Sequence, residues 1–379
     1  MWVHEDYDRR FLAAHDLKKG NLYKLTRDGV SGLLQFRYQS AFGPTDGSDH
    51  DEIHNQLRGT STPAFIQARV NLDRWCRYHS FCEAIRHYDY WPSGDNNGGW
   101  YFYPLYNAAN NNKGQLWYLP NDLDATWGPT WNNGHDIVHN ALFNDSASSG
   151  GDASTNPTLW PNYFNQIREI RSLLWQPDQI NPLIDEFAAV IRPIVNAEFI
   201  RWHPSNGAPA DSGNFGGLFG PGGSALSPLG QTALDNYIAG MKDFAFDANG
   251  GGSAWPGGNI GAGGTAARLD TIGNALAENA TKYPATPVIT FSGSPGFPVN
   301  DLRFTTSAFS DPNSDAFAGI QWRVAEVNTS ATWTAGVKRL LELNASHDSG
   351  PLAVFAGEYK FPATACEPGK RYRARVRMK

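Results

Sequence analysis

Residues 62–86 have apolar positions spaced as in an amphipathic helix. Thr62 or Ser61 can cap this segment, and Pro63 suits a first helical position. The apolar residues recur three and four positions apart, at Phe65, Ala68, Leu72, Trp75, Cys76 and Cys82. Val70, Phe81 and Ile85 widen this face. The pattern predicts one long helix that is buried on more than one side.

Two aromatic runs follow, and they predict a β-hairpin. Residues 100–107 (WYFYPLYN) and 115–120 (QLWYLP) have high β-propensity, and the intervening AANNNKG supplies turn residues. Pro120 cannot donate to a sheet ladder and favours an extended Leu119. The second strand should therefore end at Leu119.

Helical spacing returns at residues 162–175, 181–202 and 228–246. From about residue 286 the chain changes to short strand-forming runs, at residues 287–293, 302–309, 320–327 and 370–379. In the last run Tyr372, Ala374, Val376 and Met378 alternate with basic residues, as in a half-buried strand. The predicted class is α+β, with a mostly helical region at 1–285 and a small β-sandwich at 286–379.

Composition and charge exclude several functions. The chain has 31 basic and 37 acidic residues and a net charge of −6, so no broad basic surface for nucleic acid is expected. Three cysteines do not make a disulfide framework, and Cys76 and Cys82 are expected to be buried within one helix. The charged N-terminal stretch lacks the apolar core of a signal peptide. No apolar run has the length of a membrane span.

An acidic pair follows the second aromatic run. Asp122 and Asp124 are two residues apart, so an extended chain would place both carboxylates on one face. Two hard oxygen ligands suit Mg²⁺ or Mn²⁺, with phosphate and water oxygens completing the shell. In the competing interpretation Asp122 caps a turn and Asp124 faces solvent. The pattern of the pair alone does not choose between them.

Two further motifs fit less well. DLDAT at 122–126 matches the DxDxT signature of haloacid-dehalogenase-type phosphatases, but that family expects an early Rossmann-like strand, and a long helix is predicted upstream. HDIVH at 135–139 is close to the HExxH of zinc proteases, but Asp136 replaces the glutamate base and no convincing third ligand follows. His135 and Asp136 suit the start of a helix better.

The order of the remaining polar residues matches the requirements of phosphoryl transfer on a kinase scaffold. Asp89 follows the predicted helix, Asn96 and Asn97 come a few residues later, and the hairpin then leads to Asp122 and Asp124. A kinase needs one Asp to orient the acceptor hydroxyl, an Asn on the same loop to bind metal, and an Asp after a hairpin to hold Mg²⁺.

Four sequence blocks resemble the CotH family, the spore-coat protein H type of atypical protein kinase. They are GNLYKL at 20–25, RHYDYW at 86–91, NGGWYF at 97–102 and LPNDLDATWG at 119–128, in the order the family has them. The likeness covers roughly residues 1–250. It implies a kinase-like C-terminal lobe that uses ATP with Mg or Mn to phosphorylate Ser or Thr on a protein substrate.

The resemblance also implies roles for single residues. Asp89 would be the base-like catalytic aspartate, Asp122 and Asp124 the metal-binding acids, and Asn97 the loop metal ligand, with Asn96 as the alternative. His87 would orient the loop or simply pack. The family usually has Trp where Asn121 stands, a change expected to alter packing beside the metal site.

The family's ATP-gripping elements precede the GNLYKL block, so the N-terminal nucleotide-binding lobe is expected to be missing. The chain is then a fragment or a member that has lost ATP binding. Lys24 is the lysine of that block, but a strand lysine there is more often a surface residue, so it receives no role.

The C-terminal segment EPGKRYRARV resembles the penultimate strand of a fibronectin type III domain, which predicts an incomplete sandwich. The pairing of a kinase with a β-sandwich resembles large bacterial surface or secreted members, and the sequence leaves the location open. The rival hypothesis is a non-catalytic surface or adhesion module. Such a module would bind glycan or protein, and the acidic pair would be structural or bind Ca²⁺.

Overall fold

The computed structural model describes residues 7–26, 33–58, 62–85, 99–108, 112–120, 127, 160–202, 231–246 and 283–379. The chain divides into two units. The N-terminal unit comprises Met1–Ile170 with Ile194–Arg268, and the C-terminal unit comprises Arg171–Pro193 with Leu269–Lys379. Helices and antiparallel sheets are mixed along the chain, which confirms the expected α+β class.

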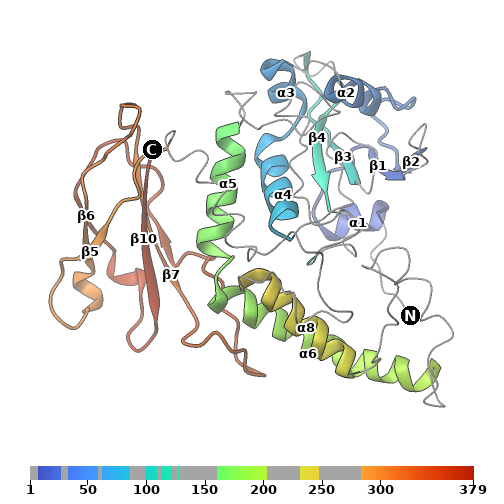
Figure 1. Cartoon of the computed structure of the whole chain (residues 1–379). Helices are drawn as coiled ribbons and strands as arrows, with labels where there is room; N and C mark the ends of the chain where they lie inside the picture. Colours follow the sequence, from blue (N-terminus) through green and yellow to red (C-terminus); the bar gives the residue numbers. More distant parts are fainter. Residues whose placement is uncertain are drawn as a thin grey trace. The chain divides into compact units, whose positions relative to one another are not determined.

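A four-stranded antiparallel sheet lies in the N-terminal unit (Figure 1). Its order is β2-β1-β3-β4, with β1 at Leu22–Thr26, β2 at Leu33–Tyr38, β3 at Gly99–Tyr103 and β4 at Gln115–Leu119. The predicted aromatic hairpin is β3 and β4, and its second strand ends at Leu119 as Pro120 predicts. The two strands β1 and β2 were not predicted, so the hairpin is half of a larger sheet.

Both faces of this sheet are covered by helices. Helix α1, Arg9–Ala14, contributes Phe11 and Leu12 to a cluster with Tyr7 and with the strand residues Leu22, Tyr101 and Leu119. On the other face Trp75 and Tyr78 of α4 contact Tyr118, with ring centroids 5.2 and 5.4 Å apart. Alternate strand residues point to opposite faces, and here both faces are buried. This explains why β3, GWYFY, is aromatic throughout and does not alternate with polar residues.

The single helix predicted at 62–86 is wrong, because the chain forms two helices. They are α3 at Pro63–Arg69 and α4 at Leu72–Ile85. Between them Val70 is extended and bridges Leu116 of β4, and the N–H of Asn71 donates to the Leu116 carbonyl at 2.9 Å. Asn71 then accepts the N–H of Arg74 at 3.1 Å, which caps α4. The predicted cap of the first helix is confirmed, since Thr62 accepts the N–H of Phe65 at 3.2 Å.

The block GNLYKL ties β1 to α2, which spans Ser48–Arg58. A Cβ at Gly20 would lie 1.8 Å from the carbonyl oxygen of Phe102, so only glycine fits there. Asn21 donates to Asp49 at 2.8 Å, and the hydroxyl of Tyr23 donates to the same carboxylate at 2.6 Å. Burial raises the pKa of Asp49 against these hydrogen bonds. These residues of the block therefore have a structural role.

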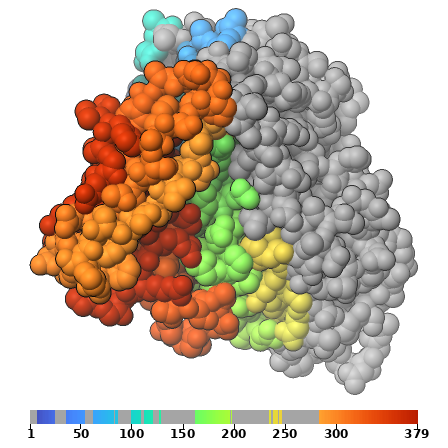
Figure 2. Space-filling view, turned by 60° about the vertical axis from the view of Figure 1, so that its left-hand side comes forward, coloured from blue at the N-terminus to red at the C-terminus, as the bar shows by residue number. Residues whose placement is uncertain are grey.

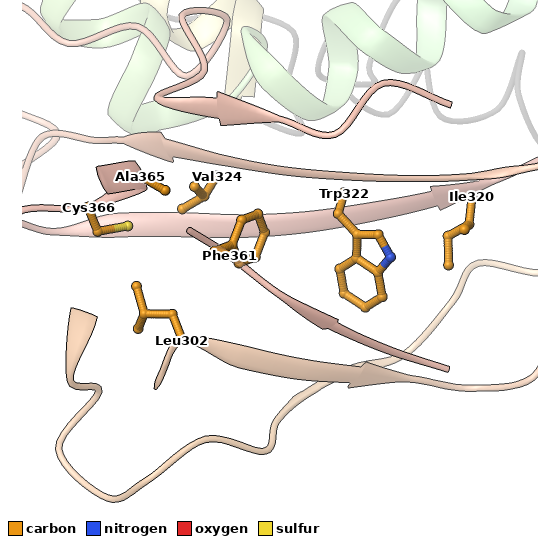
Figure 3. Close-up of a cluster of buried hydrophobic side chains, with 7 residues drawn as sticks. All are labelled: Leu302, Ile320, Trp322, Val324, Phe361, Ala365 and Cys366. Carbon is orange, nitrogen blue, oxygen red and sulfur yellow. The ribbon is translucent and has the colours of Figure 1, made fainter. Parts of the chain in front are cut away.

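Two three-stranded antiparallel sheets make up most of the described C-terminal unit, in the orders β10-β7-β8 and β5-β6-β9. The strands are β5 Ile289–Phe291, β6 Arg303–Thr306, β7 Ile320–Glu326, β8 His347–Asp348, β9 Glu358–Lys360 and β10 Tyr372–Met378. The four predicted strand runs are confirmed as β5, β6, β7 and β10. Figure 3 shows the buried side chains of this core: Leu302, Ile320, Trp322, Val324, Phe361, Ala365 and Cys366.

Strand β10 has the predicted two-faced character. Tyr372, Ala374, Val376 and Met378 all pack against the core of Figure 3. The arginines between them point to the other face of the sheet. Arg375 donates to the carbonyl of Ser172 at 2.6 Å. Arg373 and Arg375 therefore bind helical residues of this protein, whereas Arg377 donates to Gln321 of β7 at 2.8 Å.

The described α-helices after residue 159 are α5 at Trp160–Leu173, α6 at Pro177–Trp202 and α8 at Gln231–Phe246. Residues Arg171–Pro193, the end of α5 and most of α6, belong to the C-terminal unit. Figure 2 shows green helical residues beside the red and orange C-terminal strands. The cysteines are unbridged and buried, as predicted for Cys76 and Cys82.

Candidate functional site

The predicted site residues lie outside the described part of the chain. These are Asp89, Asn97, Asp122 and Asp124, with the alternative ligand Asn96 and the loop residue His87. The HDIVH motif at 135–139 also lies outside it. The structure does describe the residues that directly flank the two segments with these side chains. We call these flanking residues the anchors, and the arrangement of the site is inferred from them.

The first anchor is the open end of the hairpin, defined as the paired residues Gly99 and Leu119 opposite the turn. Gly99 is the first residue of β3, Leu119 is the last of β4, and the two are direct partners in the antiparallel register. Asn97 stands two residues before Gly99, and Asp122 stands three residues after Leu119. The predicted loop ligand and the predicted acid therefore leave the sheet from one pair of neighbouring residues.

A close contact of Gly99 fixes this open end. A Cβ at Gly99 would lie 2.6 Å from the ring of Tyr7 and 3.0 Å from the Cβ of Leu119. The Tyr7 ring occupies the space that a side chain would need, and it is buried in the cluster with α1. Glycine is thus required at the first position of β3 by packing.

The second anchor joins the end of α4 to Trp127. The backbone N–H of Trp127 donates to the carbonyl of Ile85, the last residue of α4, at 2.7 Å. Asp89 stands four residues after Ile85, and Asp124 stands three residues before Trp127. The segment with Asp89 and the segment with the acidic pair are therefore held together at both of their ends.

Trp127 is held in an uncommon backbone conformation. Its φ of 62° lies in the left-handed region, which bulky residues rarely adopt. The hydrogen bond to Ile85 and an edge contact with Phe244 of α8, at 6.3 Å between ring centroids, accompany this conformation. Such strain persists only where the surroundings fix the residue. Sequence reasoning did not single out Trp127, although it lies in the block LPNDLDATWG.

Helix α4, which leads to Asp89, is packed through buried aromatic contacts. His79 lies 4.9 Å from Tyr163 of α5 between ring centroids. Burial lowers the pKa of His79 to about 3, so its imidazole is neutral near pH 7. Burial also raises the pKa of Tyr118 on the facing strand. These groups stay neutral and serve packing.

Within the described ranges, no group of three or more His, Cys, Asp or Glu side chains is placed to hold a metal ion. A search of the same ranges for helices with the length and apolar character of a membrane span also found none.

In the sequence, the hairpin stands between an Asp–Asn segment and an acidic pair, which is the order predicted above for a kinase catalytic region. The sequence model described as CotH kinase protein matches residues 2–245, more than half of the chain. The chain therefore belongs to the CotH kinase family, and the resemblance drawn from the four blocks is confirmed. Comparisons with curated proteins and with solved structures gave no match.

Proposed function

We propose that this protein, when its nucleotide-binding lobe is present, is a phosphotransferase that moves the γ-phosphoryl group of ATP to Ser or Thr side chains of a protein substrate, with Mg²⁺ or Mn²⁺. Membership of the CotH kinase family supports the class of reaction. The site would consist of Asp89, Asn97, Asp122 and Asp124.

The double anchoring of the two site segments is the observation that carries this proposal. Gly99 pairs with Leu119, and Ile85 is hydrogen-bonded to Trp127. Three residues of extended chain span at most about 10 Å, and paired strands lie about 5 Å apart. Each of the four proposed site residues stands two to four residues from an anchor, which supports a site where their carboxylate and amide oxygens surround one ion.

The side chains have distinct roles in the proposed reaction. Asp89 accepts the proton of the acceptor hydroxyl and orients its oxygen for in-line attack on the γ-phosphorus. Asn97, Asp122 and Asp124 supply amide and carboxylate oxygens, which are ligands that a hard divalent cation prefers. These three residues would hold the cation, which would supply positive charge that offsets the charge of the phosphate group.

The experiment is transfer of radiolabelled γ-phosphate from ATP to a Ser- and Thr-containing acceptor protein, with Mn²⁺ or Mg²⁺. Asp122→Asn and Asp89→Asn should each lower transfer by about 100-fold or more, because each removes a group that acts on the reacting atoms. The matched control is Asp73→Asn on α4, whose exposed carboxylate pairs with Arg77 at 3.2 Å. Its activity should equal that of the wild type.

A second measurement tests the site itself. Mn²⁺ binding, followed by the loss of free-ion paramagnetic resonance, should show a site that Asp122→Asn removes and Asp73→Asn keeps. Absence of phosphate transfer with either ion, both from this chain and from an N-terminally extended version of it, would refute the kinase proposal. Ca²⁺ binding without any transfer would instead favour the non-catalytic surface module.

A further inference from the structure

Strand β10 forms an open edge of its sheet. In the order β10-β7-β8 its only strand neighbour among the described residues is β7 (Figure 1). The N–H of Val327 donates to the carbonyl of Arg371 at 3.0 Å, and the N–H of Lys379 donates to the carbonyl of Gly319 at 2.8 Å. In an antiparallel ladder every second residue of a strand bonds the neighbouring strand. The alternate residues between Arg371 and Lys379 therefore direct their N–H and C=O groups to the open side: Tyr372, Ala374, Val376 and Met378.

The edge of β10 differs from the other edges of the two C-terminal sheets in its length. Strand β10 has seven residues, whereas the edge strands β8, β5 and β9 have two, three and three. Short edge strands are one of the means by which proteins prevent further pairing. The four open-side residues of β10 pack against the core of Figure 3 but are only partly buried. A strand added beside β10 would cover these apolar side chains.

A second copy of β10 does not suit this edge. Hydrogen bonds across the edge would join open-side residues of both strands, so the arginines of one strand would lie opposite arginines of the other. Like charges directly opposite each other destabilise a pair of strands. The arginine side of β10 also has exposed basic residues, at Arg371, Arg377 and Lys379. A strand with acidic side chains on that side and apolar side chains toward the core would complement the edge in both respects.

We infer that the open edge of β10 is a binding site for an extended segment of a partner protein in which apolar and acidic residues alternate. The segment adds a strand to the sheet through the N–H and C=O groups of the four open-side residues. Its apolar side chains cover the core, and its acidic side chains lie opposite the arginines. The inference does not depend on the proposed function, because β10 belongs to the C-terminal unit and the four proposed site residues belong to the N-terminal one.

The direct test is amide hydrogen exchange followed residue by residue by NMR, with a short capped peptide of alternating Val and Glu as the probe. In the free protein the amides of Ala374 and Val376 should exchange quickly, whereas those of Arg373 and Arg375, which face β7, should exchange slowly. Saturating peptide should slow the exchange of Ala374 and Val376 by about tenfold or more. A peptide of alternating Val and Lys should leave their exchange unchanged.

Peptide affinity, measured by fluorescence anisotropy, gives an independent result. Ala374→Pro removes an N–H that points away from β7, an orientation in which an edge strand tolerates proline. This variant should bind the Val–Glu peptide about tenfold more weakly or worse, because it loses a hydrogen bond and the ring obstructs pairing. Arg377→Glu should weaken binding about fivefold and should raise the affinity for the Val–Lys peptide. The control Lys360→Glu, at an exposed residue of β9 in the other sheet, should bind like the wild type.

Several results would overturn the inference. Slow exchange of Ala374 and Val376 in the free protein would show that the edge is already occupied. Failure of the Val–Glu peptide to bind, equal affinity for the two peptides, or unchanged binding by Ala374→Pro would show that the edge does not select such a strand. A dimer in sedimentation that Ala374→Pro removes would assign the edge to a second copy. If Ala374→Pro does not fold, the exchange pattern of the wild type with each peptide decides.

Discussion

Replacement of Glu342 should detach residues 171–193, which we call the helical corner, from strand β10 of the C-terminal unit. The side chain of Glu342 is only 1% exposed and is bound by two arginines of β10. Arg373 donates to it at 2.5 Å and also to Asp178 of α6 at 2.9 Å. Arg375 donates to it through two nitrogens, and one of these also donates to Ser172 of α5 at 2.6 Å. Glu342 thus organises both guanidinium groups that hold residues 171–193.

The expected loss of stability follows from how deeply Glu342 and its two arginine partners are buried. Removing one partner of a buried ion pair costs about 3–5 kcal/mol. Arg373 and Arg375 are 32% and 31% exposed, so water replaces part of the hydrogen bonding that their guanidinium groups lose with Glu342. We therefore expect Glu342→Ala to destabilise the corner by about 2–3 kcal/mol. Glu342→Gln keeps one acceptor without the charge, and about 1–2 kcal/mol is expected.

Hydrogen exchange measured by mass spectrometry detects such a local opening. In Glu342→Ala, peptides covering the end of α5, the start of α6 and β10 should exchange about 30- to 150-fold faster, which corresponds to that free energy. Glu326→Gln is the control, because Glu326 pairs with the partly exposed Lys370 at 3.2 Å and should change little. Unchanged exchange of the corner in Glu342→Ala would show that the cluster does not hold the helices.

Two further substitutions test the packing behind the candidate site. The pKa of His79 is about 3 in the folded protein and about 6.5 in the unfolded chain, so between these pH values only the unfolded state binds a proton at this residue. As the pH is lowered from 6.5, the free energy of unfolding therefore decreases by about 1.4 kcal/mol per pH unit. Chemical denaturation between pH 7 and pH 4 should show that the free energy of unfolding declines less steeply in His79→Gln than in the wild type. Equal slopes in the two proteins would contradict this. Gly99→Ala should cost about 1–3 kcal/mol through its clash with Tyr7, measured by thermal unfolding. Gly357→Ala is the control, since its nearest neighbour is 3.8 Å away, and equal effects would contradict the packing argument.

Capping, proline and periodicity patterns predicted those parts of the fold that depend on a few neighbouring residues. The Thr62 cap, the end of β4 before Pro120 and the alternation of β10 each follow from a few adjacent residues. The break between α3 and α4 does not, because the apolar spacing continues through it. Val70 leaves the helix to pair with Leu116, far along the chain, and no local pattern reports a partner at that distance.

The same distinction applies to the candidate site. The sequence supplied the order of Asp89, Asn97, Asp122 and Asp124, but not the two pairings that link their segments. The partnership of Gly99 with Leu119 follows from the hairpin register, which the two aromatic runs indicated only approximately. The bond between Trp127 and Ile85 joins a turn to a helix end, and nothing in either segment identifies the other.

The family blocks combine residues of two kinds, and this affects how a match to them should be interpreted. Asn21, Gly99 and Trp127 each lie in a block, and each has a packing or hydrogen-bonding reason that requires no catalysis. A family member without activity would still need them to fold. Asp122 is different, because it lies beyond the last residue of β4. Substitution of Asp122 therefore tests the chemistry of the protein, whereas substitutions at the anchors test its folding.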